Sequence, residues 1–270
     1  MGDYVDLPGV RTWYETEGSA GEPLLLLHGG FCTNETWDPQ RADLAAEYHV
    51  FLPERRGHGR TPDVPGPFSY QDMARDTADF IEMMVGGPAH LVGWSDGAIV
   101  ALLVALTRPD VVRKVVAIGA NFRPAPECSA APGLLDHMTA DSPAMASFRE
   151  MYVAVSPDGP EHWPVVADRL LDMYRREPDL STDDLARIGV PTLVLVGDDD
   201  MLTLEHTIAL YRAIQGAELA VVPGASHALT MEKPAVVNRI VLDFLGNDPA
   251  PTLFPIRRAE AAAAAAGGHV

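Results

Sequence analysis

The pattern of hydrophobic and polar positions predicts a β-sheet that is covered by helices on both faces. Residues 10–17 alternate apolar and polar side chains, as a half-buried strand does. Continuous apolar runs follow at 24–27, 50–52, 89–92, 115–118, 193–196 and 219–222, and such strands are typical of parallel sheets with both faces buried. Helical spacing of apolar residues separates several runs, most clearly over residues 70–85. The chain is therefore predicted to be an α/β protein with a mostly parallel, doubly wound sheet.

The alternation of predicted strands and helices stops after residue 121, and about 70 residues pass before Pro191 introduces the next apolar strand. We expect an inserted helical cap at about residues 122–190, cut by prolines into short helices such as 145–155 and 165–176. Methionine and aromatic side chains in this segment either line a substrate pocket or dock the cap on the core. The cap is expected to set substrate specificity.

A chain of 270 residues with 47% hydrophobic content can bury one sizeable core. We expect one domain over residues 1–246, with the cap as its insertion. Residues 247–270 are dominated by alanine and proline, so this low-complexity tail is predicted to be peripheral.

Charge and cysteine content restrict the possible partners. The net charge is −18 and the basic residues are scattered, which argues against nucleic acid. Two cysteines cannot build a disulfide framework, and no segment is typical of a signal peptide or a membrane span. We expect a cytoplasmic protein without a membrane partner, while the oligomeric state stays open.

The candidate nucleophile is Ser95, within the sequence Gly-Trp-Ser-Asp-Gly at residues 93–97. This sequence fits G-x-S-x-G, in which a serine lies on a sharp turn between a strand and a helix. An apolar run at 89–92 precedes it and a helix-forming run at 98–106 follows, which is the context that the motif requires.

A serine hydroxyl needs an imidazole to take its proton and a carboxylate to orient that imidazole. His227 follows the last apolar strand, where sites of such sheets assemble. Asp198, Asp199 and Asp200 follow the strand before it, and the chain order alone does not choose among them. No calcium-binding loop follows these three carboxylates, so a metal site is disfavoured.

A glycine-rich turn after the strand at residues 24–27 is suited to bind a developing oxyanion through backbone N–H groups. Gly30 is the leading donor and Phe31 the alternative, together with the N–H of Asp96. His28 and His58 are interpreted as braces of their loops. The side chains that we expect to contact substrate are those of Phe31, Trp94 and Asp96.

From about residue 10 to 245 the chain resembles the α/β-hydrolase superfamily, on the motifs at 27–30, 56–59, 93–97, 191–200 and 224–227. This resemblance implies that the acid is the last residue of Gly-x-x-Asp, Asp200. Glu54 departs from it, because many members have aspartate there. Residues 93–97 with 119–121 look more narrowly like the valacyclovir hydrolase (biphenyl-hydrolase-like) group, in which the acid beside the nucleophile receives a substrate α-amino group. That role would fall to Asp96; the alternative is that its carboxylate only bonds to the cap or to the backbone.

We therefore expect a serine hydrolase that needs no cofactor and cleaves a small carboxylic ester or lactone through an acyl-enzyme. One alternative keeps the same triad for hydrolysis of a C–C bond or for a perhydrolase reaction. A second, of a different class, is a non-catalytic receptor for a small ligand, although an intact triad argues against it.

Overall fold

Eight strands form one sheet in the computed structural model, which describes residues 2–131, 133, 135–247 and 252–257. Their order across the sheet is β1-β2-β4-β3-β5-β6-β7-β8. The strands are β1 Asp3–Leu7, β2 Val10–Glu17, β3 Pro23–Leu27, β4 His49–Pro53, β5 Ala89–Trp94, β6 Val112–Ile118, β7 Thr192–Asp199 and β8 Glu218–Ser226.

Strands β3 to β8 pair in parallel, whereas β1 and β2 add an antiparallel edge next to β4. The predicted α/β fold with a mostly parallel sheet is thus confirmed. Strand β1 was not predicted, because its sequence Asp-Tyr-Val-Asp-Leu is short and has no continuous apolar run.

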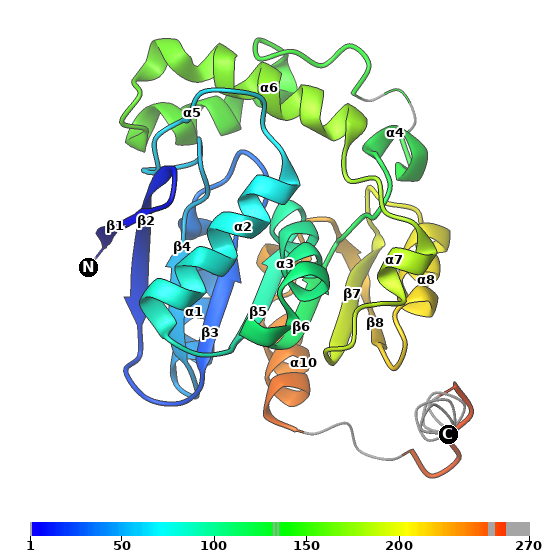
Figure 1. The fold of residues 1–270 in the computed structure, drawn as a ribbon. Coiled ribbons are helices and arrows are strands. Elements are labelled where there is room, and N and C mark those ends of the chain that lie inside the picture. Colours follow the sequence, from blue (N-terminus) through cyan, green and yellow to red (C-terminus); the bar gives the residue numbers. More distant parts are fainter. Residues whose placement is uncertain (1, 132, 134, 248–251, 258–270) are drawn as a thin grey trace.

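Helices cover the sheet on both faces (Figure 1). The α-helices of the described residues, including those between β6 and β7, are α1 Asp38–Ala45, α2 Tyr70–Phe80, α3 Asp96–Thr107, α4 Ala125–Cys128, α5 Ala146–Val155, α6 Trp163–Arg176, α7 Thr182–Leu185, α8 Leu204–Ala213, α9 Leu229–Glu232 and α10 Pro234–Gly246. The predicted helical segment at 70–85 is α2 followed by a π-helical turn, Ile81–Val85.

Alternate residues of β3 belong to two separate apolar cores, because successive side chains of a strand point to opposite faces. Leu25 and Leu27 pack in the cluster that contains α2 and α3, whereas Leu24 and Leu26 pack in the cluster that contains α1 and α10. This arrangement explains why the strand is apolar at every position.

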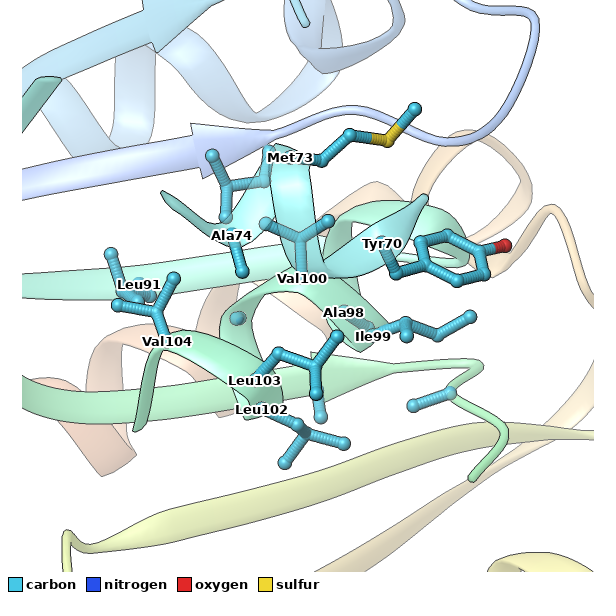
Figure 2. Packing of buried hydrophobic residues seen from close by; sticks show 14 of the residues in the cluster. Tyr70, Met73, Ala74, Leu91, Ala98, Ile99, Val100, Leu102, Leu103 and Val104 are labelled. Carbon is cyan, nitrogen blue, oxygen red and sulfur yellow. The ribbon is translucent and has the colours of Figure 1, made fainter. Parts of the chain in front are cut away.

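Helix α3 lies deepest among the helices and is apolar around most of its circumference, with residues 96–105 all buried. Figure 2 shows its side chains in one cluster with Met73 and Ala74 of α2 and Leu91 of β5. Tyr70 lies at one end of this cluster, with its hydroxyl oxygen directed away from the aliphatic side chains (Figure 2). The start of α3, which follows Ser95, is therefore held on a rigid base.

The segment between β6 and β7 contains α4 to α7, and α5 and α6 extend over one end of the sheet (Figure 1). Phe31, which follows β3, packs against Phe148, Trp163 and Tyr174 of this segment. These contacts place α5 and α6 over the carboxyl end of β3. We call residues 122–190 the insert; that the insert sets specificity stays a prediction.

Only Asn247 and residues 252–257 of the predicted tail belong to the described part of the chain. Arg257 donates hydrogen bonds to carbonyl groups at the end of α8, including those of Tyr211 and Ile214. The alanine-rich stretch at 259–268 lies outside the described residues. Among the described helices, none is long and apolar enough to cross a bilayer.

Candidate active site

Ser95 lies between the end of β5 and the start of α3, in a left-handed backbone conformation with φ 55° and ψ −121°. The two glycines of the motif make this sharp turn possible. A Cβ on Gly93 would lie 2.2 Å from the Gly97 carbonyl oxygen, and one on Gly97 would lie 2.0 Å from the Leu27 carbonyl oxygen. Larger residues cannot fit there without moving the backbone, so both glycines are needed to present Ser95.

Three side chains that were predicted from separate strands come together at this turn. His227 Nε2 lies 2.9 Å from Ser95 Oγ, and His227 Nδ1 lies 2.8 Å from Asp200 Oδ1. Nδ1 therefore donates to the carboxylate, which leaves Nε2 free to accept the serine proton.

Of the three consecutive aspartates, Asp200 alone contacts His227 within the described residues. Its carboxylate is buried, and Oδ1 also accepts the backbone N–H of Leu202 at 3.0 Å. Asp198 is exposed and accepts the backbone N–H groups of Gly224 and Ala225 instead. No group of three or more His, Cys, Asp or Glu side chains in the described ranges is placed to hold a metal ion.

Two further residues determine where the His227 ring lies. Gly119, at φ 59°, follows β6, and a Cβ at this position would lie 2.8 Å from His227 Cε1. The Trp94 indole N–H donates to the His227 carbonyl at 2.8 Å. Trp94 therefore braces the histidine loop, and its predicted contact with substrate stays a prediction.

The predicted oxyanion turn packs directly against the nucleophile turn, since a Cβ on Gly97 would also meet the His28 carbonyl. Phe31 has a positive φ of 59°, so the chain reverses sharply here. Within the described residues the N–H groups of Gly30 and Phe31 have no hydrogen-bond acceptor. The N–H of Asp96 begins α3 and has no carbonyl partner inside that helix. That these N–H groups bind an oxyanion stays a prediction.

The Asp96 carboxylate is buried and both its oxygens already accept hydrogen bonds. Tyr70 Oη donates to Oδ1 and Tyr174 Oη donates to Oδ2, each at 2.9 Å. Burial raises the pKa of Asp96, whereas the nearby Arg55 charge and the two hydroxyls lower it. Tyr174 comes from the insert, so Asp96 joins the insert to the nucleophile turn.

Arg55 follows β4 and is itself buried beside the oxyanion turn. Its guanidinium donates to the His28 carbonyl at 2.5 Å and to the Gly29 carbonyl at 3.0 Å. The Arg55 backbone N–H donates to His28 Nε2, while His28 Nδ1 donates to the Gly29 carbonyl. His28 thus has a bracing position, and burial holds its pKa well below its usual range.

Four residues of this site were not assigned to it from the sequence: Arg55, Tyr70, Gly119 and Tyr174. Of these, Tyr174 is one of the aromatic residues of the insert that were expected either to line a pocket or to dock the cap on the core. Tyr70 and Tyr174 are 26 and 78 residues from Asp96, and no spacing rule connects residues so far apart. Arg55 directly precedes the motif at 56–59, in which only His58 was interpreted, as a brace of its loop. Gly119 carried a usable signal, because a glycine directly after a parallel strand lies at the edge where such sites form.

A doubly wound sheet that carries Ser95, His227 and Asp200 at the carboxyl ends of its strands is the arrangement of α/β-hydrolases. The profile of the alpha/beta hydrolase family matches residues 24–240. The chain belongs to this family and is a hydrolase.

Similar proteins span nearly the whole chain. The (E)-2-((N-methylformamido)methylene)succinate hydrolase of Acinetobacter baylyi is 26% identical over 258 residues, which cover 91% of this chain and 98% of that protein. Human serine hydrolase BPHL is 27% identical over 254 residues, with coverages of 89% and 85%. A solved thermophilic esterase from Thermogutta terrifontis is 27% identical with a TM-score of 0.71, and the match covers 90% of this chain and 98% of that chain. The resemblance to the valacyclovir hydrolase group is confirmed by the match to BPHL.

Proposed function

We propose that the protein is a serine hydrolase that cleaves a small carboxylic ester or lactone through an acyl-enzyme. The observation that carries this proposal is the continuous chain of hydrogen bonds from Ser95 through His227 to the buried Asp200. Matches to a serine hydrolase and to an esterase support it.

In the first half-reaction, Ser95 Oγ attacks the ester carbonyl while His227 Nε2 takes the hydroxyl proton. The Asp200 carboxylate stabilises the imidazolium that forms. The N–H groups of Gly30 and Asp96 donate to the oxygen that becomes negative, with that of Phe31 as the alternative to Gly30. His227 then returns the proton to the leaving alkoxide, and the acyl group remains on Ser95.

In the second half-reaction, a water molecule takes the place of the leaving group. His227 accepts a proton from this water, which attacks the acyl carbonyl and forms the acid product. Ser95 Oγ leaves with the proton that His227 holds. For a lactone the alcohol and acid are parts of one product, and the same groups serve both steps.

The surroundings of the oxyanion turn favour an uncharged, apolar acyl group. The ring of Phe31 lies 5.5 Å from that of Phe148 and 5.6 Å from that of Tyr174, which makes one wall of the site aromatic. Apolar acyl groups gain free energy when they leave water for such a wall. Both oxygens of Asp96 are occupied by tyrosine hydroxyls, so a neutral substrate leaves these bonds intact.

A second specificity, for aminoacyl esters, follows from the buried Asp96 carboxylate beside the nucleophile. An ammonium group would have to replace the Tyr70 or Tyr174 hydroxyl at Asp96 and would then form a charge-assisted hydrogen bond. The resemblance to the BPHL group favours this reading, and the two tyrosine hydrogen bonds oppose it.

Turnover of p-nitrophenyl acetate by the wild type and by the Ser95→Ala variant tests the proposed reaction. We expect a burst of p-nitrophenol equal to the enzyme concentration when deacylation is slow, and linear release otherwise. A wild type that hydrolyses neither this ester nor a set of short-chain lactones would contradict the proposal.

A further inference from the structure

A buried arginine, Arg55, lies behind the oxyanion turn and takes no part in the reaction described so far. It stands beside a second arginine, Arg56, whose guanidinium forms two hydrogen bonds of 2.7 Å with Asp76. Arg56 thus has an ordinary carboxylate partner. Within the described residues Arg55 has no carboxylate within 4 Å; its guanidinium instead contacts backbone carbonyls and the His28 ring.

The carbonyls that Arg55 binds control the direction of the Gly30 N–H. The Gly29 carbonyl and the Gly30 N–H belong to one peptide group, which is planar and trans, so they point in opposite directions. A guanidinium that holds the Gly29 oxygen at 3.0 Å therefore directs the Gly30 N–H away from itself. The bond to the His28 carbonyl fixes the preceding peptide in the same way.

The same turn lies against a buried negative charge. A Cβ on Gly30 would be 2.6 Å from Asp96 Oδ2 and 2.0 Å from Tyr174 Oη. The Asp96 carboxylate therefore packs against the turn that is proposed to bind an oxyanion. An unopposed carboxylate at this place would repel the charge that develops in the reaction, because charges interact strongly where water is excluded.

We propose that Arg55 is a positioning residue, which orients the Gly30 N–H through the His28 and Gly29 carbonyls and offsets the charge of Asp96 beside the oxyanion turn. This inference rests on the proposed hydrolase function. The mutual influence of Arg55 and Asp96 on their pKa values agrees with it, because each opposes the effect of burial on the other.

Other titratable groups face this pair from the surrounding elements, and they bear on any pH test. Burial lowers the pKa of His58 to about 3, so this ring beside Arg55 stays neutral. Burial raises the pKa of Cys32 to about 12, so its thiol stays protonated. The groups that interact with Asp96 are Tyr70 of α2, Tyr174 of α6, Arg55, Cys32 and His227.

The test compares kcat and KM for p-nitrophenyl acetate in the wild type, Arg55→Met and Arg56→Met. Loss of an oxyanion-hole donor lowers kcat by about 10²–10³, and Arg55 only orients such a donor, so Arg55→Met should lower kcat by roughly 10- to 100-fold. KM should change by less than about threefold, since the ground-state ester bears no charge. Arg56→Met is the matched control and should lower thermal stability while keeping kcat within about threefold.

A pH profile separates charge compensation from a purely structural role. Without Arg55 the pKa of Asp96 rises further, so Asp96 is neutral at low pH and anionic at high pH. The ratio of wild-type kcat to Arg55→Met kcat should therefore increase with pH. The double variant Arg55→Met/Asp96→Asn should abolish this increase and recover at least about fivefold in kcat over Arg55→Met at pH 8.

If Arg55→Met does not fold, two other variants test the inference: the double variant Arg55→Met/Asp96→Asn, which buries no unpaired charge, and Arg55→Lys. Arg55→Lys should keep the wild-type pH profile and still have a lower kcat. One ammonium group cannot replace the two guanidinium nitrogens that donate to the His28 and Gly29 carbonyls. A folded Arg55→Met or Arg55→Lys enzyme with wild-type kcat would overturn the inference alone. Equal losses of kcat in Arg55→Met and Arg56→Met would also overturn it. A wild type without Ser95-dependent hydrolysis would overturn the proposed function and this inference together.

Discussion

Replacing Asp200 by asparagine removes the charge that stabilises the His227 imidazolium and changes little else. The carboxylate is buried and lies 2.8 Å from His227 Nδ1. Two unit charges about 4 Å apart interact by about 4 kcal/mol at an effective dielectric constant of about 20. Each 1.4 kcal/mol corresponds to about tenfold in rate, so loss of this charge should lower kcat by about 10³-fold.

The orientation of the new amide decides whether the loss is larger. Asp200 Oδ1 accepts both His227 Nδ1–H and the Leu202 N–H, which favours the amide oxygen at this position and keeps the right tautomer. If the NH₂ group turns there instead, Nε2 becomes protonated and the loss reaches about 10⁴-fold. We therefore expect Asp200→Asn to retain between about 10⁻³ and 10⁻⁴ of wild-type kcat.

Asp198→Asn is the matched control. Its amide oxygen can still accept the N–H groups of Gly224 and Ala225, and the side chain is exposed. The variant should stay within about tenfold of wild-type kcat. Steady-state kinetics with p-nitrophenyl acetate, with circular dichroism as a check on folding, measures both. A folded Asp200→Asn enzyme with more than about a tenth of wild-type kcat would refute the assignment of the acid.

Three further predictions concern the surroundings of the triad. Gly119→Ala should lower kcat by about 10²-fold, because a Cβ would lie 2.8 Å from His227 Cε1 at a positive φ; unchanged kinetics would show that the ring is not confined there. If the site takes aminoacyl esters, the wild type should prefer them over des-amino analogues by roughly 10- to 100-fold in kcat/KM, and Asp96→Asn should erase this preference; equal kcat/KM in the wild type would leave Asp96 without an amine-binding role. Burial raises the pKa of Glu54 to about 6, so the folded state holds a proton that the unfolded state has lost and stability falls as pH rises through this window. The free energy of unfolding of Glu54→Gln minus that of the wild type should therefore increase by about 2 kcal/mol between pH 4.5 and neutral pH, as measured by urea denaturation. A stability difference that does not change with pH would contradict the raised pKa of Glu54.

The sequence pattern predicted the sheet well, because strands buried on both faces are apolar at most positions. Residues 24–27 and 89–92 lie within β3 and β5 as expected. The pattern failed at two elements, whereas the half-buried strand β2 was recognised by the alternation of its side chains. Strand β1, at the edge, and helix α1, whose buried residues are only Gln40 and Leu44, carry too few apolar side chains to be recognised.

For the site, the positions of Ser95 and His227 followed from motif and strand order, since the carboxyl ends of parallel strands meet at one edge. The choice of Asp200 among three aspartates needed the family resemblance, because a shift of one residue reverses which side of a strand a side chain faces. The partners of Asp96 could not be predicted. Tyr174 reaches Asp96 only because α6 of the insert docks there, and Tyr70 comes from α2; contacts over 78 and 26 residues of separation leave no periodic signal in the sequence.

The most direct test of the central claim, that Ser95 is the nucleophile, is mass spectrometry of the protein after reaction with a fluorophosphonate. We expect one adduct per chain, located by peptide mapping at Ser95, and no adduct in Ser95→Ala at the same concentration and time. Ser95→Ala should keep its fold while kcat falls by several orders of magnitude. An adduct on another residue, or Ser95→Ala turnover above about a tenth of wild type, would contradict the assignment of Ser95 as the nucleophile.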